Sequence, residues 1–212
     1  MSRSFSALSC ACAISLFTSP AFATPVISEL LYDASGADAG ATFVELWGTP
    51  GESLDGLVLE GINGSNGAVY KSLNLSGFLP ADGVLVIGDD DGGSTSIANA
   101  DLIADIDLQN GPDSLVLRDA SGILDALGYG SFDTGEVFAG EGSAAPDAPA
   151  GSSLARLAPW MDTDDNSADF VVLATPTPGS VPVASTVPLP GGLWLFASGL
   201  LSLLMRGRAA GG

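Results

Sequence analysis

The sequence predicts an all-β fold, a sandwich or a barrel of short strands, for residues 24–175. Short apolar runs recur along this stretch, and Gly, Asp and Asn separate them. This is the pattern of strands joined by tight turns. No part of the stretch shows a sustained apolar period of about 3.6 residues, so long helices are not expected. The stretch is long enough for one domain with a hydrophobic core.

Ten segments carry the strand pattern. In chain order they are 26–32, 42–47, 57–62, 68–75, 83–87, 101–106, 114–118, 123–129, 153–157 and 170–173. Residues 119–122 read Asp-Ala-Ser-Gly, a composition typical of a tight turn, and are expected to join two of these strands into a hairpin. Residues 176–186 are rich in Pro, Thr and Ser, which predicts a semi-extended linker after the domain.

The first 23 residues have the organisation of a secretory signal peptide. Arg3 supplies the positive charge, residues 7–17 are mostly apolar, and Ala21-Phe22-Ala23 is a small-x-small cleavage site. We expect cleavage after Ala23. A lipoprotein signal at Cys10 is the alternative, but only nine residues precede this cysteine. Both cysteines of the chain lie in the removed segment, so the mature protein would contain no disulfide.

The last 26 residues combine a proline motif, an apolar run and an arginine pair. The motif is Val187, Pro188, Leu189 and Pro190, the apolar run is 193–205, and the pair is Arg206 and Arg208. A helix over 193–205 would be about 20 Å long, short of the roughly 30 Å hydrocarbon core of a bilayer. We expect a marginal transmembrane helix whose arginines stay on the cytoplasmic side. A buried C-terminal core helix is the alternative.

This order of features resembles the PEP-CTERM sorting signals of bacterial envelope proteins, in the VPLPA-type variant. The resemblance implies that an exosortase-type enzyme recognises residues 187–212 at the inner membrane. The protein would be anchored there through its C-terminal helix and then passed to the cell surface or the exterior. Leu189 stands where the namesake motif has a glutamate, so the choice of processing enzyme stays open.

Segments of the body also resemble a family, in the expected order. They are 26–32, 43–47, 54–59, 110–119, 125–130, 153–156, 162–170 and 175–179. The first two read Val-Ile-Ser-Glu-Leu-Leu-Tyr and Phe-Val-Glu-Leu-Trp. They resemble the lamin-tail domain, a family of immunoglobulin-like β-sandwiches found in nuclear lamins and in secreted bacterial proteins. The resemblance implies an immunoglobulin-like sandwich that serves attachment.

The charge of the body excludes several functions. All 25 acidic residues lie between Glu29 and Asp169, against Lys71, Arg118 and Arg156, which gives a formal charge of −22. Such a surface repels nucleic acid. The chain contains no histidine, and its mature form would contain no cysteine. This excludes His-activated and Cys nucleophiles and His-ligated zinc. A carboxylate pair for glycoside hydrolysis stays open.

One acidic stretch has the composition of a calcium loop. Its oxygen-bearing side chains are Asp162, Asp164, Asp165, Asn166 and Asp169, and Ca²⁺ prefers six to eight oxygen ligands. The glycine and the terminal glutamate of an EF-hand are absent. The alternative is that these side chains cap turns by bonding to nearby backbone. A second acidic run, 89–91, is more typical of a solvated loop.

Together these features predict an exported, non-enzymatic module of the cell surface or extracellular matrix. Exopolysaccharide is the binding partner that such a destination suggests, and Ca²⁺ is the cofactor that the composition allows. Two alternatives stay open. One is a carboxylate-based hydrolase of matrix polysaccharide, and the other is a structural envelope protein permanently anchored by its tail.

Overall fold

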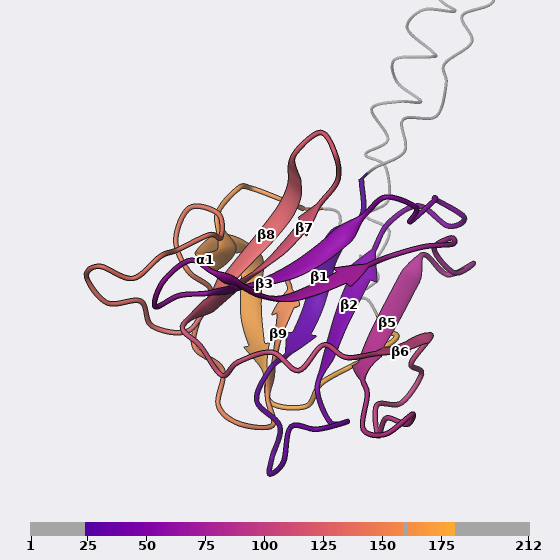
Figure 1. The fold of residues 1–212 in the computed structure, drawn as a ribbon, viewed down its shortest axis with the longest axis horizontal. Helices are drawn as coiled ribbons and strands as arrows, with labels where there is room; N and C mark the ends of the chain where they lie inside the picture. Colours follow the sequence, from indigo (N-terminus) through magenta and orange to yellow (C-terminus); the bar gives the residue numbers. More distant parts are fainter. Residues whose placement is uncertain (1–23, 159–160, 181–212) are drawn as a thin grey trace, which may run out of the picture.

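The computed structural model describes residues 24–158 and 161–180, which form two β-sheets packed face to face (Figure 1). One sheet has six strands in the order β10-β9-β1-β2-β5-β6, and the other has four in the order β4-β3-β7-β8. The strands are β1 (Val26–Leu31), β2 (Phe43–Trp47), β3 (Val58–Asn63), β4 (Val69–Asn74), β5 (Val84–Asp89), β6 (Leu102–Ala104), β7 (Asp113–Arg118), β8 (Ile123–Tyr129), β9 (Ser153–Arg156) and β10 (Phe170–Leu173). Neighbouring strands are antiparallel except β5 and β6.

The all-β prediction is confirmed, and each predicted segment overlaps one strand. The one helix in the described residues is α1 (Asn166–Asp169), which is a single turn. The largest difference is at 101–106, where only Leu102–Ala104 pairs with β5. The chain leaves the sheet after Ala104 because Ile106 and Leu108 turn into the core.

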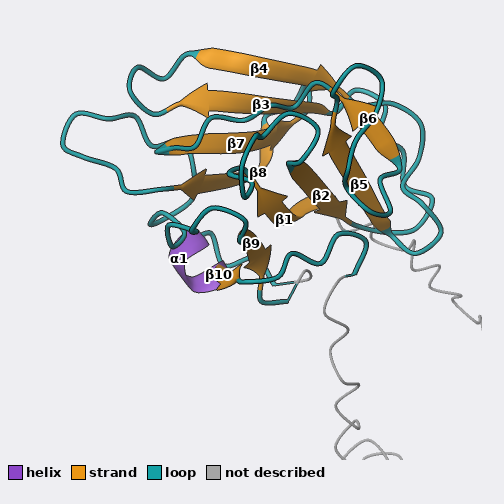
Figure 2. Cartoon of the chain, turned by 90° about the horizontal axis from the view of Figure 1, so that it is seen from below, coloured by secondary structure: helices purple, strands orange, loops and turns teal. Residues whose placement is uncertain are grey.

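Apolar side chains from both sheets fill the space between the two layers, which Figure 2 shows stacked on each other. Leu30, Leu46 and Ile87 enter it from the six-stranded sheet, and Leu117 and Leu127 enter it from the four-stranded sheet. Alternate residues of a strand face opposite sides. The other face of the six-stranded sheet therefore carries a second, smaller apolar cluster, composed of Leu31, Phe43, Val84 and Val86.

The predicted hairpin between β7 and β8 is present. The N–H of Asp119 donates to the carbonyl of Gly122 (3.0 Å). The Asp119 carboxylate accepts from the N–H groups of Ser121 (2.7 Å) and Gly122 (3.1 Å). Aspartate is common in tight turns because its carboxylate accepts hydrogen bonds from the backbone of its own turn, and this is why the composition of 119–122 predicted a turn.

Several predicted features lie outside the described residues. They are the signal peptide 1–23 with Ala21 and Ala23, and the sorting signal 187–212 with Val187, Pro188, Leu189, Pro190, the helix 193–205, Arg206 and Arg208. Within 24–158 and 161–180, no helix is long and apolar enough to cross a membrane.

The beginning of the predicted linker is part of the fold. The sequence predicted that the folded domain ends at residue 175, but the backbone of Thr177 and Gly179 is bonded to Glu29 and Glu45 of the six-stranded sheet. The described residues 176–180 therefore belong to the domain, because two buried glutamates bind them.

Candidate functional site

Arg156 of β9 is buried where the two sheets meet, with 1% of its surface exposed. β9 pairs with β1 only at Glu29 and Leu30, so the backbone of Ile27 lies beyond this pairing. Arg156 Nε donates to the carbonyl of Ile27 (3.0 Å), and the N–H of Ile27 donates to the carboxylate of Asp125 on β8. Arg156 and Asp125 therefore tie the two sheets together.

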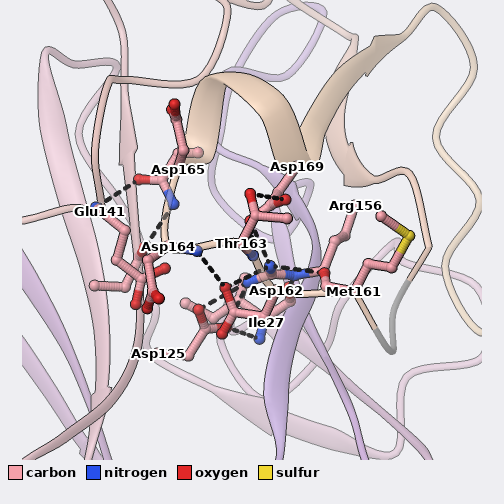
Figure 3. A network of polar contacts seen from close by, with 12 residues as sticks. Ile27, Asp125, Glu141, Arg156, Met161, Asp162, Thr163, Asp164, Asp165 and Asp169 are labelled. Carbon is pink, nitrogen blue, oxygen red and sulfur yellow. Dashed lines mark hydrogen bonds and ion pairs between the residues drawn. The ribbon is translucent and has the colours of Figure 1, made fainter.

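Three carboxylates surround this guanidinium (Figure 3). Arg156 Nη2 donates to both oxygens of Asp125, at 2.8 and 3.0 Å. Nη1 donates to Asp169 (3.2 Å) and Asp162 (3.3 Å). The guanidinium also lies over the ring of Phe170, 4.7 Å from its centroid. Bidentate, charge-assisted bonds of this kind are the strong ones in proteins, so we name Arg156, Asp125, Asp162 and Asp169 the arginine cluster.

Two of the predicted calcium ligands, Asp169 and Asp165, are bonded to the fold itself. Asp169, besides its contact with Arg156, accepts from the hydroxyl of Thr163 (2.8 Å). Asp165 is the N-cap of α1 and accepts from the N–H (3.1 Å) and the hydroxyl (2.8 Å) of Ser167. These bonds lower the pKa of Asp165, because they stabilise its charged form.

Asn166 is a third predicted ligand that serves the fold. Its amide oxygen accepts from the N–H groups of Gly128 (2.8 Å) and Glu141 (3.0 Å), and its amide nitrogen donates to the carbonyl of Ala126 (2.8 Å). The side chain is fully buried. Asn166 therefore joins β8 to the loop that contains Glu141. Asp165 and Asn166 therefore bond to the backbone, as the alternative to calcium binding expected.

A group with metal-ligand spacing does occur in the described residues, but its members differ from the predicted set. Asp125, Glu141 and Asp162 each place an oxygen within 4.8 Å of the others. Arg156 already bonds to two of these acids, so a protein cation neutralises charge where a metal would. Of the predicted ligands, Asp162 and Asp164 are exposed, and Asp162 is also bonded to Arg156, so calcium binding at this loop stays a prediction.

Burial raises the pKa of two acids in this group, Asp125 and Glu141. Oε2 of Glu141 is buried and has no hydrogen-bond partner among the described residues. Burial, and then repulsion from Asp125 and Asp162, raises the pKa of Glu141 to about 7. Loss of solvation disfavours the charged form of a carboxyl group, and nearby negative charge adds to the effect. Glu141 is therefore the group in this region that can exchange a proton near neutral pH.

The acidic run 89–91 is only partly the solvated loop that its composition suggested. Asp90 and Asp91 are exposed. Asp89, at 2% exposure, accepts from the N–H groups of Gly40 (2.8 Å) and Ile106 (3.1 Å). Its carboxylate therefore holds two loops against the end of β5.

Sequence reasoning did not identify Arg156 or Asp125 as a pair, although both belong to predicted strands. They are 31 residues apart, and no local spacing connects them. A usable signal is Arg156 itself, one of only three basic residues in the body and placed on a short, otherwise apolar strand. An arginine at such a position needs a buried acid, but the sequence offers 25 acids.

The fold and the site define an all-β, strongly acidic domain whose buried arginine and carboxylates cross-link its two sheets. Comparison with known proteins adds no relative: no protein-family model matches the chain, and no curated protein matches it.

Proposed function

We propose that this protein is an exported, non-enzymatic module of the cell surface or matrix, sorted through its C-terminal membrane signal. The observation that carries the non-enzymatic part is the arginine cluster. Its acids bind Arg156 and cross-link the sheets, so these three carboxylates serve the architecture of the domain. Export rests on the two ends of the sequence, with an exosortase-type enzyme as processing partner and exopolysaccharide as ligand.

The two-sheet fold is consistent with the proposed lamin-tail, immunoglobulin-like type. Two packed sheets of mostly antiparallel strands are the architecture of a domain of this class. The body's formal charge of −22 keeps an exported module dispersed, and we propose that it contacts acidic polysaccharide through bridging Ca²⁺. Calorimetric titration with Ca²⁺ tests this bridge, with Asp164→Ala as the variant. A heat of Ca²⁺ binding that is present in the wild-type protein and absent in the variant supports the calcium bridge. The absence of any such heat in the wild-type protein rejects the bridge.

Cell fractionation with intact-mass measurement tests the proposal. The expected species begins at Thr24 and is found in the envelope or the medium. Loss of 193–205 from the released form would show processing of the tail. A tail retained in an envelope-bound form would support the permanently anchored structural protein instead. Unprocessed chain in the cytosol, with both ends intact, would reject export.

A hydrolase is the second candidate, because one observation favours it. Glu141, with its pKa of about 7, lies close to the exposed Asp162. A carboxyl group with a raised pKa beside a second carboxylate is the arrangement of a general acid and its partner in glycoside hydrolysis. In this candidate Glu141 would donate the proton, and activity would be lost in Glu141→Gln.

A further inference from the structure

Residues 177–179, which we name the strap, lie across two glutamates of the six-stranded sheet. The N–H of Thr177 donates to Glu29 Oε1 (2.8 Å), and its hydroxyl donates to Glu29 Oε2 (2.7 Å). The N–H of Gly179 donates to Glu45 Oε2 (2.8 Å). The sequence placed this segment in a free linker, whereas the structure binds it to β1 and β2.

Glu29 and Glu45 are an unusual pair. They are direct cross-strand partners on β1 and β2, and their exposed fractions are 2% and 1%. Like charges directly opposite each other destabilise a sheet. In the described residues neither carboxylate has an ion-pair partner. Burial raises the pKa of Glu45, and the charge of Glu29 adds to this.

Neutral donors therefore satisfy the pair, and most of them come from the strap. Ser28 donates to Glu45 (2.7 Å) and Ser153 donates to Glu29 through their hydroxyls. Thr177 and Gly179 supply the other three of the five donors. A buried carboxylate without donors is costly. Removal of the strap would leave each glutamate with one hydroxyl and would require water to enter.

The backbone conformation of Gly179 fixes the path of the strap at its C-terminal end. Gly179 has a φ of +79°, and a Cβ there would lie 3.1 Å from Cβ of Asn99. Asn99 in turn donates through Nδ2 to the carbonyl of Pro178 (3.2 Å). Only glycine adopts such a backbone conformation without strain, so position 179 specifies the docked path.

We propose that Glu29 and Glu45 form a latch for the strap, and that docking of the strap sets the number of residues between the domain and the sorting motif. With the strap docked, residues 181–186 separate the domain from Val187, a span of at most about 20 Å. With the strap released after β10, residues 174–186 separate the domain from Val187, a span of at most about 45 Å. The latch therefore controls how far the domain stands from the tail, a consequence that rests on the proposed function.

Hydrogen exchange on the full-length chain tests the latch without reference to export. The variant is Thr177→Val with Gly179→Ala, which removes one donor and strains the docked path while leaving the sheets unchanged. The expected result is protection of the Thr177 and Gly179 amides in the wild-type protein, and exchange at least about tenfold faster in the variant. The control is Thr175→Val, at an exposed position two residues earlier, which should exchange like the wild-type protein. Strap amides that exchange in the wild-type protein as fast as an unstructured peptide would overturn the latch.

The rate of tail processing in the producing cells tests whether the latch affects the distance between the domain and the sorting motif. The strap variant should release tail-processed protein faster than the wild-type protein and the Thr175→Val control, by at least about twofold, because the sorting motif can then reach farther from the domain. Equal rates in all three proteins would overturn the role of the latch in processing. If none of the three is exported, the proposed function fails and this consequence fails with it, while hydrogen exchange still decides whether the latch exists.

Discussion

The arginine cluster and the Glu29–Glu45 latch bury acids in opposite ways. In the cluster, Asp125 and Asp169 lie against one buried cation that also contacts exposed Asp162. In the latch, two carboxylates face each other and receive only neutral donors. A cation cancels charge where it lies, whereas neutral donors only solvate it. The cluster is therefore expected to be a permanent cross-link, and the latch is a contact that one short segment can leave.

Removing the cation should have the largest effect. In Arg156→Met, the buried Asp125 and Asp169 lose their partner, and the free energy of unfolding should fall by about 3–5 kcal/mol. Urea denaturation measures this change. The control is Arg118→Met, whose half-exposed ion pair with Glu60 should contribute less than about 1 kcal/mol. Equal losses in the two variants would contradict a structural role for the cluster.

Neutralising one acid in each region sharpens the comparison. Asp125→Asn removes charge from a group bonded to a cation and should cost about 1.5–3 kcal/mol. Glu45→Gln also loses acceptor strength, but it relieves the repulsion by Glu29, so we expect a change below about 1 kcal/mol. Both values come from the same denaturation experiment. A larger loss in Glu45→Gln than in Asp125→Asn would reverse the account of the two regions.

The smallest effect is the pH dependence caused by Glu141. Its pKa rises from 4.5 to about 7 in the fold, so the folded state holds this proton more tightly than the unfolded state does. The resulting stability is present below the unfolded pKa and is lost as the pH rises through about 7. Glu141→Gln should show a smaller loss of stability over this range. Because Glu141 is partly exposed, solvent screening keeps the difference small. Parallel pH profiles for the two proteins would show that Glu141 keeps an ordinary pKa.

The sequence predicted the strands well because their signal is local. Alternation, β-branched residues and turn residues such as Asp119 act within a few positions. The N-cap at Asp165 belongs to the same class, since its acceptor lies two residues from its donor. By contrast, the bonds that join the two sheets at the candidate site and the bonds that hold the strap connect positions far apart in the chain. Arg156 and Asp125 are 31 residues apart, and Thr177 and Glu29 are 148 apart.

The acid-rich loop shows where composition misleads. Five carboxylate or amide side chains in 162–169 suit Ca²⁺, but ligand chemistry and backbone capping need the same residue types. The role that such a side chain takes depends on the groups that the fold places beside it. Arg156 lies beside Asp169, and the backbone of β8 lies beside Asn166. The start of the linker illustrates a similar point, because Pro and Thr favour extended chain whether or not a sheet binds it, and Thr177 and Gly179 are bonded to the sheet.

The central claim is that the acids of the body hold the domain together and do not catalyse. The most direct test is to incubate the folded protein with exopolysaccharide from its producing cells, on both sides of the Glu141 pKa of about 7, and to count new reducing ends. We predict none above the level of buffer, for the wild-type protein and for Glu141→Gln alike. Reducing ends that the wild-type protein releases and a folded Glu141→Gln variant does not would contradict the claim.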